Sequence, residues 1–458
     1  MQIPTNHIYL ATILLKRRQN LAKLINFPVI LWSGSRSSRN FPANTFPFRC
    51  SSHFLYFAGL PIENAAICLE GEKLTLFMDN PPPSNLLWHG EIPTGDRLAE
   101  IIGADAAFPM SELKFYATNA ATISVQNPIT KITQSEVLNR DIFPANKAEE
   151  IDLELTKAII FLRLSHDDAA LTEIKQAVAV TMEAHKAGMA ATTNAKFEAN
   201  IRAAMENIII SDNMTCAYPS IVTVHGEVLH NEEYFHPVQK GDLLLADVGA
   251  ETSLGWASDV TRTWPVSGKF SSTQKDIYDV VLAAHDHCIS QIKPGVEYLD
   301  IHLLAAKVIA EGLVDLGILK GKVEDLVEMD AHALFFPHGI GHLLGLDVHD
   351  MEDLGDLAGY EIGRERSNRF GLGFLRLNRP LIPGMLVTIE PGFYQVPAIL
   401  NNQEMRGKYQ NIVNWEKLEK FSDVRGIRIE DDVLVTTNGA EVLTQELPTN
   451  TDGIENLM

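Results

Sequence analysis

Four acidic residues interrupt stretches that are otherwise apolar and typical of buried β-strands, and this feature constrains the fold more than any other. They are Asp247, Asp259, Glu390 and Glu430. An ionised carboxylate is costly to bury unless it is paired or bound to a metal. Taken one at a time, each acid is explained as an ordinary strand-end residue in a salt bridge. The four together balance the charge of two divalent cations, so the set predicts a metal centre.

A second stretch, residues 336–350, is rich in histidine and glycine. It contains His338, His342 and His349, interleaved with three glycines. A helix would place the first two histidines on one face, but each glycine weakens a helix by about 1 kcal/mol. No glutamate follows His338, so the segment is not the H-E-x-x-H helix of zinc proteases. We expect a loop whose imidazoles act with ligands from elsewhere. Carboxylates with one imidazole suit Mn²⁺, Co²⁺, Fe²⁺ or Zn²⁺.

Hydrophobic runs and alternation predict the strands that carry these acids. The predicted strands span residues 243–248, 259–265, 386–390 and 426–433. Glycines between the first two strands suit a hairpin. In the last strand Arg428 and Glu430 share a face, because side chains alternate along a strand.

The chain of 458 residues is long enough for two or three domains. We place a boundary near residue 145, where the pattern loosens and Pro144 interrupts it. Residues 1–145 predict a smaller mixed α/β domain, in which residues 54–57 are expected to form a strand. Residues 146–458 are expected to form the catalytic domain. Apolar residues at helical spacing predict helices in it around residues 197–208, 277–288 and 299–316.

Composition and charge exclude several classes of partner. The formal net charge is -21, so the surface repels phosphate backbones and nucleic acid is not expected as a partner. The sequence contains no run approaching the roughly 18 apolar residues of a membrane-spanning helix. The apolar run at residues 8–15 precedes its positive charges, unlike a secretory signal. The cysteines lack C-x-x-C spacing, which suits a reducing compartment. We expect no membrane association and a cytoplasmic location.

Motifs spread over the chain carry a resemblance to a known family. They lie, in this order, at residues 229–231, 245–249, 259–263, 338–349, 388–392 and 428–432. With them the chain resembles the proline-specific metallopeptidases of the pita-bread fold, aminopeptidase P and prolidase. The resemblance covers nearly the whole chain. It implies an α/β (α+β) fold, in which a smaller creatinase-like N-terminal domain precedes a pita-bread catalytic domain with a curved antiparallel sheet backed by helices.

The resemblance also implies a metal centre and an activity. Two divalent ions, Mn²⁺ in the first place with Co²⁺ or Zn²⁺ as alternatives, would be held by Asp247, Asp259, His342, Glu390 and Glu430. The activity would be that of an Xaa-Pro aminopeptidase. This enzyme hydrolyses the bond between an N-terminal residue and a penultimate proline with a metal-bridging hydroxide, whose proton Glu390 would handle.

Further residues receive catalytic and substrate-binding roles from the same resemblance. His230 and His349 would line the substrate site and stabilise the tetrahedral intermediate. His338 would help to shape the proline pocket. Arg428 would hold a ligating carboxylate in its orientation. The expected partners are peptides with proline at the second position and further copies of this chain, as a dimer or tetramer.

Two alternatives remain open. The stretches on either side of Glu390 are longer than in short bacterial aminopeptidases P, and Arg376 matches the position where prolidases hold the carboxylate of a dipeptide. An Xaa-Pro dipeptidase is therefore the alternative activity. A more distant alternative is a non-catalytic or creatinase-like relative that lacks the metals, but all five ligand positions are occupied here.

Overall fold

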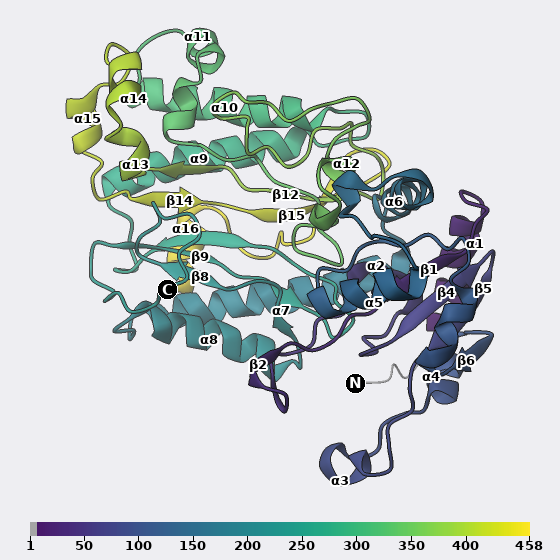
Figure 1. The fold of residues 1–458 in the computed structure, drawn as a ribbon. Coiled ribbons are helices and arrows are strands. Elements are labelled where there is room, and N and C mark those ends of the chain that lie inside the picture. Colours follow the sequence, from purple (N-terminus) through teal and green to yellow (C-terminus); the bar gives the residue numbers. More distant parts are fainter. Residues whose placement is uncertain (1–6) are drawn as a thin grey trace. The chain divides into compact units, whose positions relative to one another are not determined.

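The computed structural model describes residues 7–458, which divide into two compact units (Figure 1). The first unit comprises residues 7–164, 253–255 and 351–358, and the second comprises residues 165–252, 256–350 and 359–458. The boundary that we place at residue 145 stays a prediction. Both units mix helices and strands, as expected for an α/β chain. Among residues 7–458, every helix is too short or too polar to cross a membrane.

The first unit is built on a mixed sheet with the strand order β1-β4-β5-β6. The first three of these strands pair antiparallel, and β6 joins β5 in parallel. Apolar side chains of Ile30, Trp32 and Phe77 form part of the buried cluster on this sheet. The elements in chain order are α1 (His7–Ala22), β1 (Val29–Trp32), β2 (Ser38–Phe41), β3 (Asn44–Thr45), α2 (Ser52–Ala58), β4 (Ala66–Glu70), β5 (Lys73–Phe77), α3 (Asn85–His89), α4 (Gly95–Ile102), β6 (Ala106–Phe108), η1 (Met110–Tyr116), α5 (Pro128–Leu138), η2 (Ala145–Lys147), α6 (Glu150–Arg163), η4 (Glu352–Leu354) and most of α12 (Asp356–Gly359).

The expected strand at residues 54–57 is wrong. These residues belong to the helix α2, which ends at Gly59 in a left-handed conformation with φ of 67°. Every residue of α2 is buried. A helix that is buried on all sides has no polar face, so its apolar run shows neither helical nor strand periodicity.

The second unit consists of antiparallel strands and long helices. Its elements are α7 (Asp168–Thr192), α8 (Glu198–Ser211), β7 (Thr215–Cys216), β8 (Ile221–Thr223), β9 (Leu243–Asp247), β10 (Ala250–Glu251), β11 (Thr261–Pro265), α9 (Ser272–Gln291), α10 (Tyr298–Asp315), α11 (Val323–Glu328), η3 (Ala331–Leu334), β12 (Leu386–Ile389), β13 (Gly392–Tyr394), α13 (Pro397–Leu400), α14 (Gln403–Lys408), α15 (Trp415–Glu419), β14 (Gly426–Arg428), β15 (Asp431–Val435), β16 (Ala440–Val442) and α16 (Thr451–Leu457). The predicted helices around residues 197–208, 277–288 and 299–316 correspond to α8, α9 and α10.

The strands of the second unit lie between two pairs of helices, α7 with α8 and α9 with α10 (Figure 1). The sheets have the orders β11-β9-β8, β12-β15-β16, β13-β14 and β10-β7, and every pairing in them is antiparallel. Trp264 is fully buried between β11 and the helices, and its indole nitrogen donates to Thr192 Oγ1 at 2.9 Å. This burial explains why the strands carry continuous apolar runs rather than an alternating pattern.

The single strand that we expect at residues 426–433 is in fact two strands, β14 and β15. They pair in different sheets, β14 with β13 and β15 with β12 and β16. Ile429 and Glu430 lie between them, and their amides donate to the carbonyl oxygens of Pro391 and Thr261, respectively. Tertiary hydrogen bonds therefore replace one continuous ladder at the point where an acid leaves the strand.

Candidate metal centre

The pairing of β9 with β11 brings two acids to one end of a hairpin. Asp247 is the last residue of β9, and Asp259 stands two residues before the start of β11. In the antiparallel register Asp247 lies opposite Thr261. The amide of Val248 also donates to the carbonyl oxygen of Val260, at 3.0 Å. The two carboxylates therefore meet because of strand register, although eleven sequence positions separate them.

The pairing of β12 with β15 brings the other two acids together in the same manner. Glu390 directly follows β12, and Glu430 directly precedes β15. Ile389 and Asp431 are partners in the antiparallel register. Both glutamates therefore lie just beyond the same end of this strand pair.

The histidine-rich segment is attached along β12. The amide of Thr388 donates to the carbonyl oxygen of His342 at 3.0 Å, and the amide of Glu390 donates to that of Ile340 at 2.8 Å. A Cβ atom at Gly341 would lie 2.2 Å from the carbonyl oxygen of Thr388, so a glycine is needed for this approach. The segment is a loop, as expected, and the close approach sets His342 beside Glu390.

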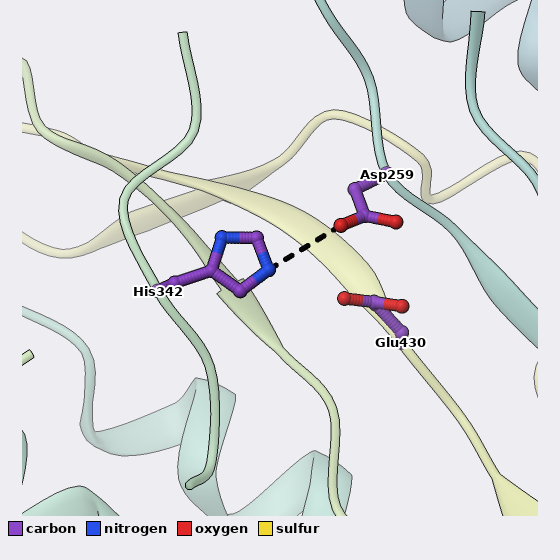
Figure 2. A group of neighbouring side chains, drawn as sticks. All are labelled: Asp259, His342 and Glu430. Atoms are coloured by element: carbon purple, nitrogen blue, oxygen red, sulfur yellow. Dashed lines mark ion pairs between the residues drawn. The ribbon is translucent and has the colours of Figure 1, made fainter. Parts of the chain in front are cut away.

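Three of these side chains converge on a common point (Figure 2). One donor atom each from Asp259, His342 and Glu430 lies within 4.8 Å of the others. His342 Nε2 is 3.3 Å from an oxygen of Asp259 and 3.8 Å from an oxygen of Glu390. This spacing is compatible with ligands that surround a divalent ion.

A cavity of about 300 Å³ opens over this group. All ten residues to which the sequence analysis assigns a site role line it: His230, Asp247, Asp259, His338, His342, His349, Arg376, Glu390, Arg428 and Glu430. Asp247 and Glu390 lie outside the group of three but on the same walls. The structure thus brings the predicted residues together, while their individual roles stay predictions.

The carboxyl groups of the site are buried close to one another, and this raises their pKa values. Burial, followed by the charge of Asp247, raises the pKa of Asp259 to about 8. Burial is also the largest cause that raises the pKa of Glu390 to about 7. Burial and the charges of Asp259 and Glu390 raise the pKa of Glu430 well above its usual range. A divalent cation would relieve this repulsion, and oxygen ligands with one imidazole suit such ions.

Several residues that the sequence analysis missed support these acids. The Tyr218 hydroxyl lies within hydrogen-bond distance of Asp247 and Asp259. Thr261 Oγ1 donates to Glu430 at 2.7 Å. The amide of Asp259 donates to a carboxylate oxygen of Asp432 at 3.2 Å. Thr261 could have been found, because it stands two positions after Asp259 on the same strand face. Tyr218 follows no repeating pattern and carries no such signal.

Arg428 connects the acids with the substrate side of the cavity. Its guanidinium donates to Asp247 at 2.6 Å and to the Tyr394 hydroxyl at 2.9 Å. The same hydroxyl is hydrogen-bonded to His338 Nε2 at 2.9 Å. Burial lowers the pKa of His338 to about 3, so its imidazole stays neutral. The ring of His349 lies 4.3 Å from that of His342, measured between centroids.

Comparisons with known proteins agree with this geometry. The model of metallopeptidase family M24 matches residues 172–437, and that of the aminopeptidase P N-terminal domain matches residues 14–126. A probable Xaa-Pro aminopeptidase of Pyrenophora tritici-repentis is 33% identical over 90% of this chain and 87% of its own length. The human Xaa-Pro dipeptidase is 31% identical over 93% of this chain and 88% of its own.

Solved structures extend the comparison to the whole chain. An aminopeptidase from Pseudomonas aeruginosa superposes with a TM-score of 0.78 at 29% identity, over 100% of this chain and 99% of that one. Escherichia coli aminopeptidase P in complex with substrate superposes with a TM-score of 0.79 at 27% identity, over 98% of both chains. These likenesses confirm the predicted fold class. The chain belongs to metallopeptidase family M24, with the two-domain fold of aminopeptidase P.

Proposed function

We propose that this protein is an Xaa-Pro aminopeptidase, which hydrolyses the peptide bond between an N-terminal residue and a penultimate proline. The observation that carries the proposal is the convergence of ten predicted side chains on one cavity, with acids, imidazoles and arginines in separate places along its wall. The names of the similar fungal and bacterial proteins support it. Proline forms a tertiary amide, so a dedicated pocket is needed where general aminopeptidases expect an N–H.

The donor set supports a site for two divalent ions, held by Asp247, Asp259, His342, Glu390 and Glu430. When bound, such ions lower the pKa of a water molecule and polarise the scissile carbonyl group. Mn²⁺ is the ion that we propose first, with Co²⁺ or Zn²⁺ as alternatives. A zinc-substituted Escherichia coli aminopeptidase P is among the similar structures, at 26% identity and a TM-score of 0.77.

The side chains of the site divide the remaining work. The pKa of about 7 lets Glu390 take up and return a proton near neutral pH. Burial, followed by the charge of Arg428, lowers the pKa of His230, so its neutral imidazole can donate one hydrogen bond to a developing oxyanion. His349 would do the same from beside His342. Arg428 orients Asp247, and the neutral His338 borders the proline ring.

The Xaa-Pro dipeptidase is the second candidate. Arg376 lines the same cavity, where its guanidinium could bind the carboxylate that follows the proline of a dipeptide. The similarity to the human Xaa-Pro dipeptidase supports this alternative. The chemistry at the metal centre would be the same for both activities, so the substrate end decides between them.

The deciding experiment compares a matched Xaa-Pro dipeptide and Xaa-Pro-Yaa tripeptide, each with Mn²⁺ and with a chelator. An aminopeptidase releases the first residue of the tripeptide rapidly, and the chelator abolishes this release. Cleavage of the dipeptide alone would establish the dipeptidase. Cleavage of neither peptide by metal-loaded protein would overturn both and favour a non-catalytic relative.

We further propose a homo-oligomer, a dimer or a tetramer, and a cytoplasmic location. Similar enzymes that assemble motivate the first proposal, and light scattering of the purified protein tests it. In the described chain, residues 7–458, all four cysteines are free thiols, which supports a reducing compartment. We also keep residues 1–145 and 146–458 as the proposed domains, to be tested by expressing each separately.

A further inference from the structure

We propose that Tyr360 and Arg366 are positioning residues that fix Arg376 on the cavity wall, so that the site prefers peptides with a free C-terminal carboxylate. The inference rests on the proposed function and deepens it. Arg376 itself lines the cavity, whereas neither Tyr360 nor Arg366 is among the lining residues. They act through the backbone on either side of it.

The segment that carries Arg376 is long and irregular. Residues 361–377 contain turns and bends but, within the described chain, no helix or strand. Loops of this length without secondary structure are uncommon in compact domains and are usually functional or disordered. A mobile loop would be a poor holder for a recognition arginine, because productive geometry requires a side chain fixed to within about half an ångström.

Ion pairs anchor both halves of this segment. Arg364 forms a two-point pair with Glu297, at 2.6 and 3.0 Å. Arg369 donates to Asp330 at 2.7 Å. Two-point contacts between arginine and a carboxylate fix orientation as well as distance. The segment is therefore held in place, although it lacks a backbone ladder.

The peptide unit before Arg376 is held from two directions. The Tyr360 hydroxyl donates to the carbonyl oxygen of Leu375 at 2.8 Å, and Arg366 donates to the same oxygen at 2.8 Å. The guanidinium of Arg366 also lies 5.3 Å from the centroid of the Tyr360 ring. Tyr360 is buried, with 3% of its surface exposed. One charged and one neutral donor thus fix a single carbonyl group.

The peptide unit after Arg376 is held as well. A Cβ atom at Gly359 would lie 2.1 Å from the carbonyl oxygen of Arg376, so the two backbones are in close contact there. The amide of Asn378 donates to the carbonyl oxygen of Gly359 at 2.8 Å. With the peptide units on both sides restrained, the direction of the Arg376 side chain is set by the backbone.

The cavity around Arg376 is suited to an anion on its substrate side. Arg376 and Arg428 both contribute to the lowered pKa of His230, after the larger effect of burial. The guanidinium of arginine matches the geometry of a carboxylate with two parallel hydrogen bonds. A short peptide whose C-terminal carboxylate reaches Arg376 would gain this contact, and the same peptide with a C-terminal amide would not.

The test uses the full-length enzyme loaded with Mn²⁺ and an Ala-Pro peptide with either a free C-terminal carboxylate or a C-terminal amide. We expect the unsubstituted enzyme to show a KM about tenfold lower for the carboxylate form, which is typical for a hydrogen bond to a charged group. Arg366→Met should remove most of this preference, and kcat should change by less than about twofold, because the metal centre is untouched. Tyr360→Phe should remove part of the preference.

Arg364→Met provides the matched control, because this neighbouring arginine holds Glu297 and does not contact the carbonyl of Leu375. It should leave the preference for the carboxylate intact. Arg366→Lys should restore part of the preference, because lysine keeps one charged donor. The inference is overturned if the unsubstituted enzyme cleaves both forms equally, or if Arg366→Met and Arg364→Met change the preference alike. In either case the proposed function stands. Cleavage of no Xaa-Pro peptide at all would instead overturn the proposed function.

Discussion

Glu430 and Asp431 are neighbours in the sequence and equally buried, each with 2% of its surface exposed, yet their carboxyl groups behave in opposite ways. Burial and the nearby charges of Asp259 and Glu390 raise the pKa of Glu430 well above its usual range. Burial would also raise the pKa of Asp431, but the charge of Arg262 and a hydrogen bond from His285 lower it to about 2.

The difference lies in the partners on the two sides of the chain. Arg262 is fully buried and donates to Asp431 at 2.6 Å and to the carbonyl oxygen of Glu430 at 2.6 Å. His285 Nε2 lies 3.0 Å from the second oxygen of Asp431. Asp431 is thus neutralised by protein groups, whereas Glu430 faces further acids. One acid serves the fold, and the other leaves a negative charge that a metal ion can balance.

The largest expected effect comes from removing the charge on the uncompensated side. Glu430→Gln should lower Mn²⁺-dependent cleavage of an Xaa-Pro-Yaa peptide by about a thousandfold or more, because a metal ligand contributes several kcal/mol to the transition state. The metal-free variant should keep its far-UV circular dichroism and melt no earlier than the unsubstituted protein. Activity close to that of the unsubstituted enzyme would contradict the assignment of Glu430 to the metal centre.

Removal of the neighbouring charge should harm stability instead. Asp431→Ala leaves Arg262 buried without its carboxylate, which typically costs about 3–5 kcal/mol in the free energy of unfolding. Urea unfolding of the metal-free protein measures this loss, with Glu430→Gln as the matched neighbour. A loss below about 1 kcal/mol in Asp431→Ala would show that Arg262 and His285 do not depend on this acid.

The sequence alone predicted a good part of this contrast. Alternation along residues 426–433 put Arg428 and Glu430 on one face, and both line the cavity. It could not show that the strand breaks at Ile429, because the break depends on hydrogen bonds from Pro391 and Thr261, which are distant in sequence. The partners of Asp431 were equally hidden, since Arg262 and His285 come from a strand and a helix that only tertiary packing brings to it.

Local pattern succeeded where burial was one-sided or where a motif marked the chemistry. The apolar runs around Asp247 and Glu390 were predicted as strands, and β9 and β12 cover them. The run at residues 54–57 failed, because burial on all sides removes the periodicity that separates a helix from a strand. Tyr218 was missed for a related reason: it lies outside every repeating pattern, and its contacts with Asp247 and Asp259 arise from tertiary structure.

The pH dependence of stability should separate the two kinds of acid. The raised pKa of Asp259, about 8, means that the folded metal-free protein binds more protons than the unfolded chain between about pH 4 and pH 8. Its stabilising contribution is present below pH 4 and is lost as the pH rises towards 8. Asp431, with a pKa of about 2, contributes stability above about pH 4 that is lost as the pH falls towards 2.

We therefore expect the free energy of unfolding of metal-free protein to fall between pH 5 and pH 8, by on the order of 2 kcal/mol. Saturating Mn²⁺ should reverse this trend, because the metal binds the deprotonated ligands. Asp259→Asn should flatten the slope of the metal-free protein. An unchanged slope in that variant would mean that other groups cause the pH dependence.

The smallest expected effect tests how the acid of the metal centre is held. Thr261 and Thr263 are both fully buried on β11, and both contact Arg428. Thr261 Oγ1 also donates to Glu430, whereas Thr263 Oγ1 donates to the carbonyl oxygen of Arg428. Thr261→Val should weaken Mn²⁺ binding about tenfold, as is typical when a partner of a metal ligand is lost. Calorimetric titration of metal-free protein measures this affinity. Thr263→Val removes a comparable hydroxyl without touching Glu430 and should leave the affinity within about twofold, although each variant loses on the order of 1 kcal/mol of stability from its broken hydrogen bonds. Equal affinities for the two variants would mean that the backbone alone, held by Arg262, orients Glu430, and that the fold side of this chain governs the metal side.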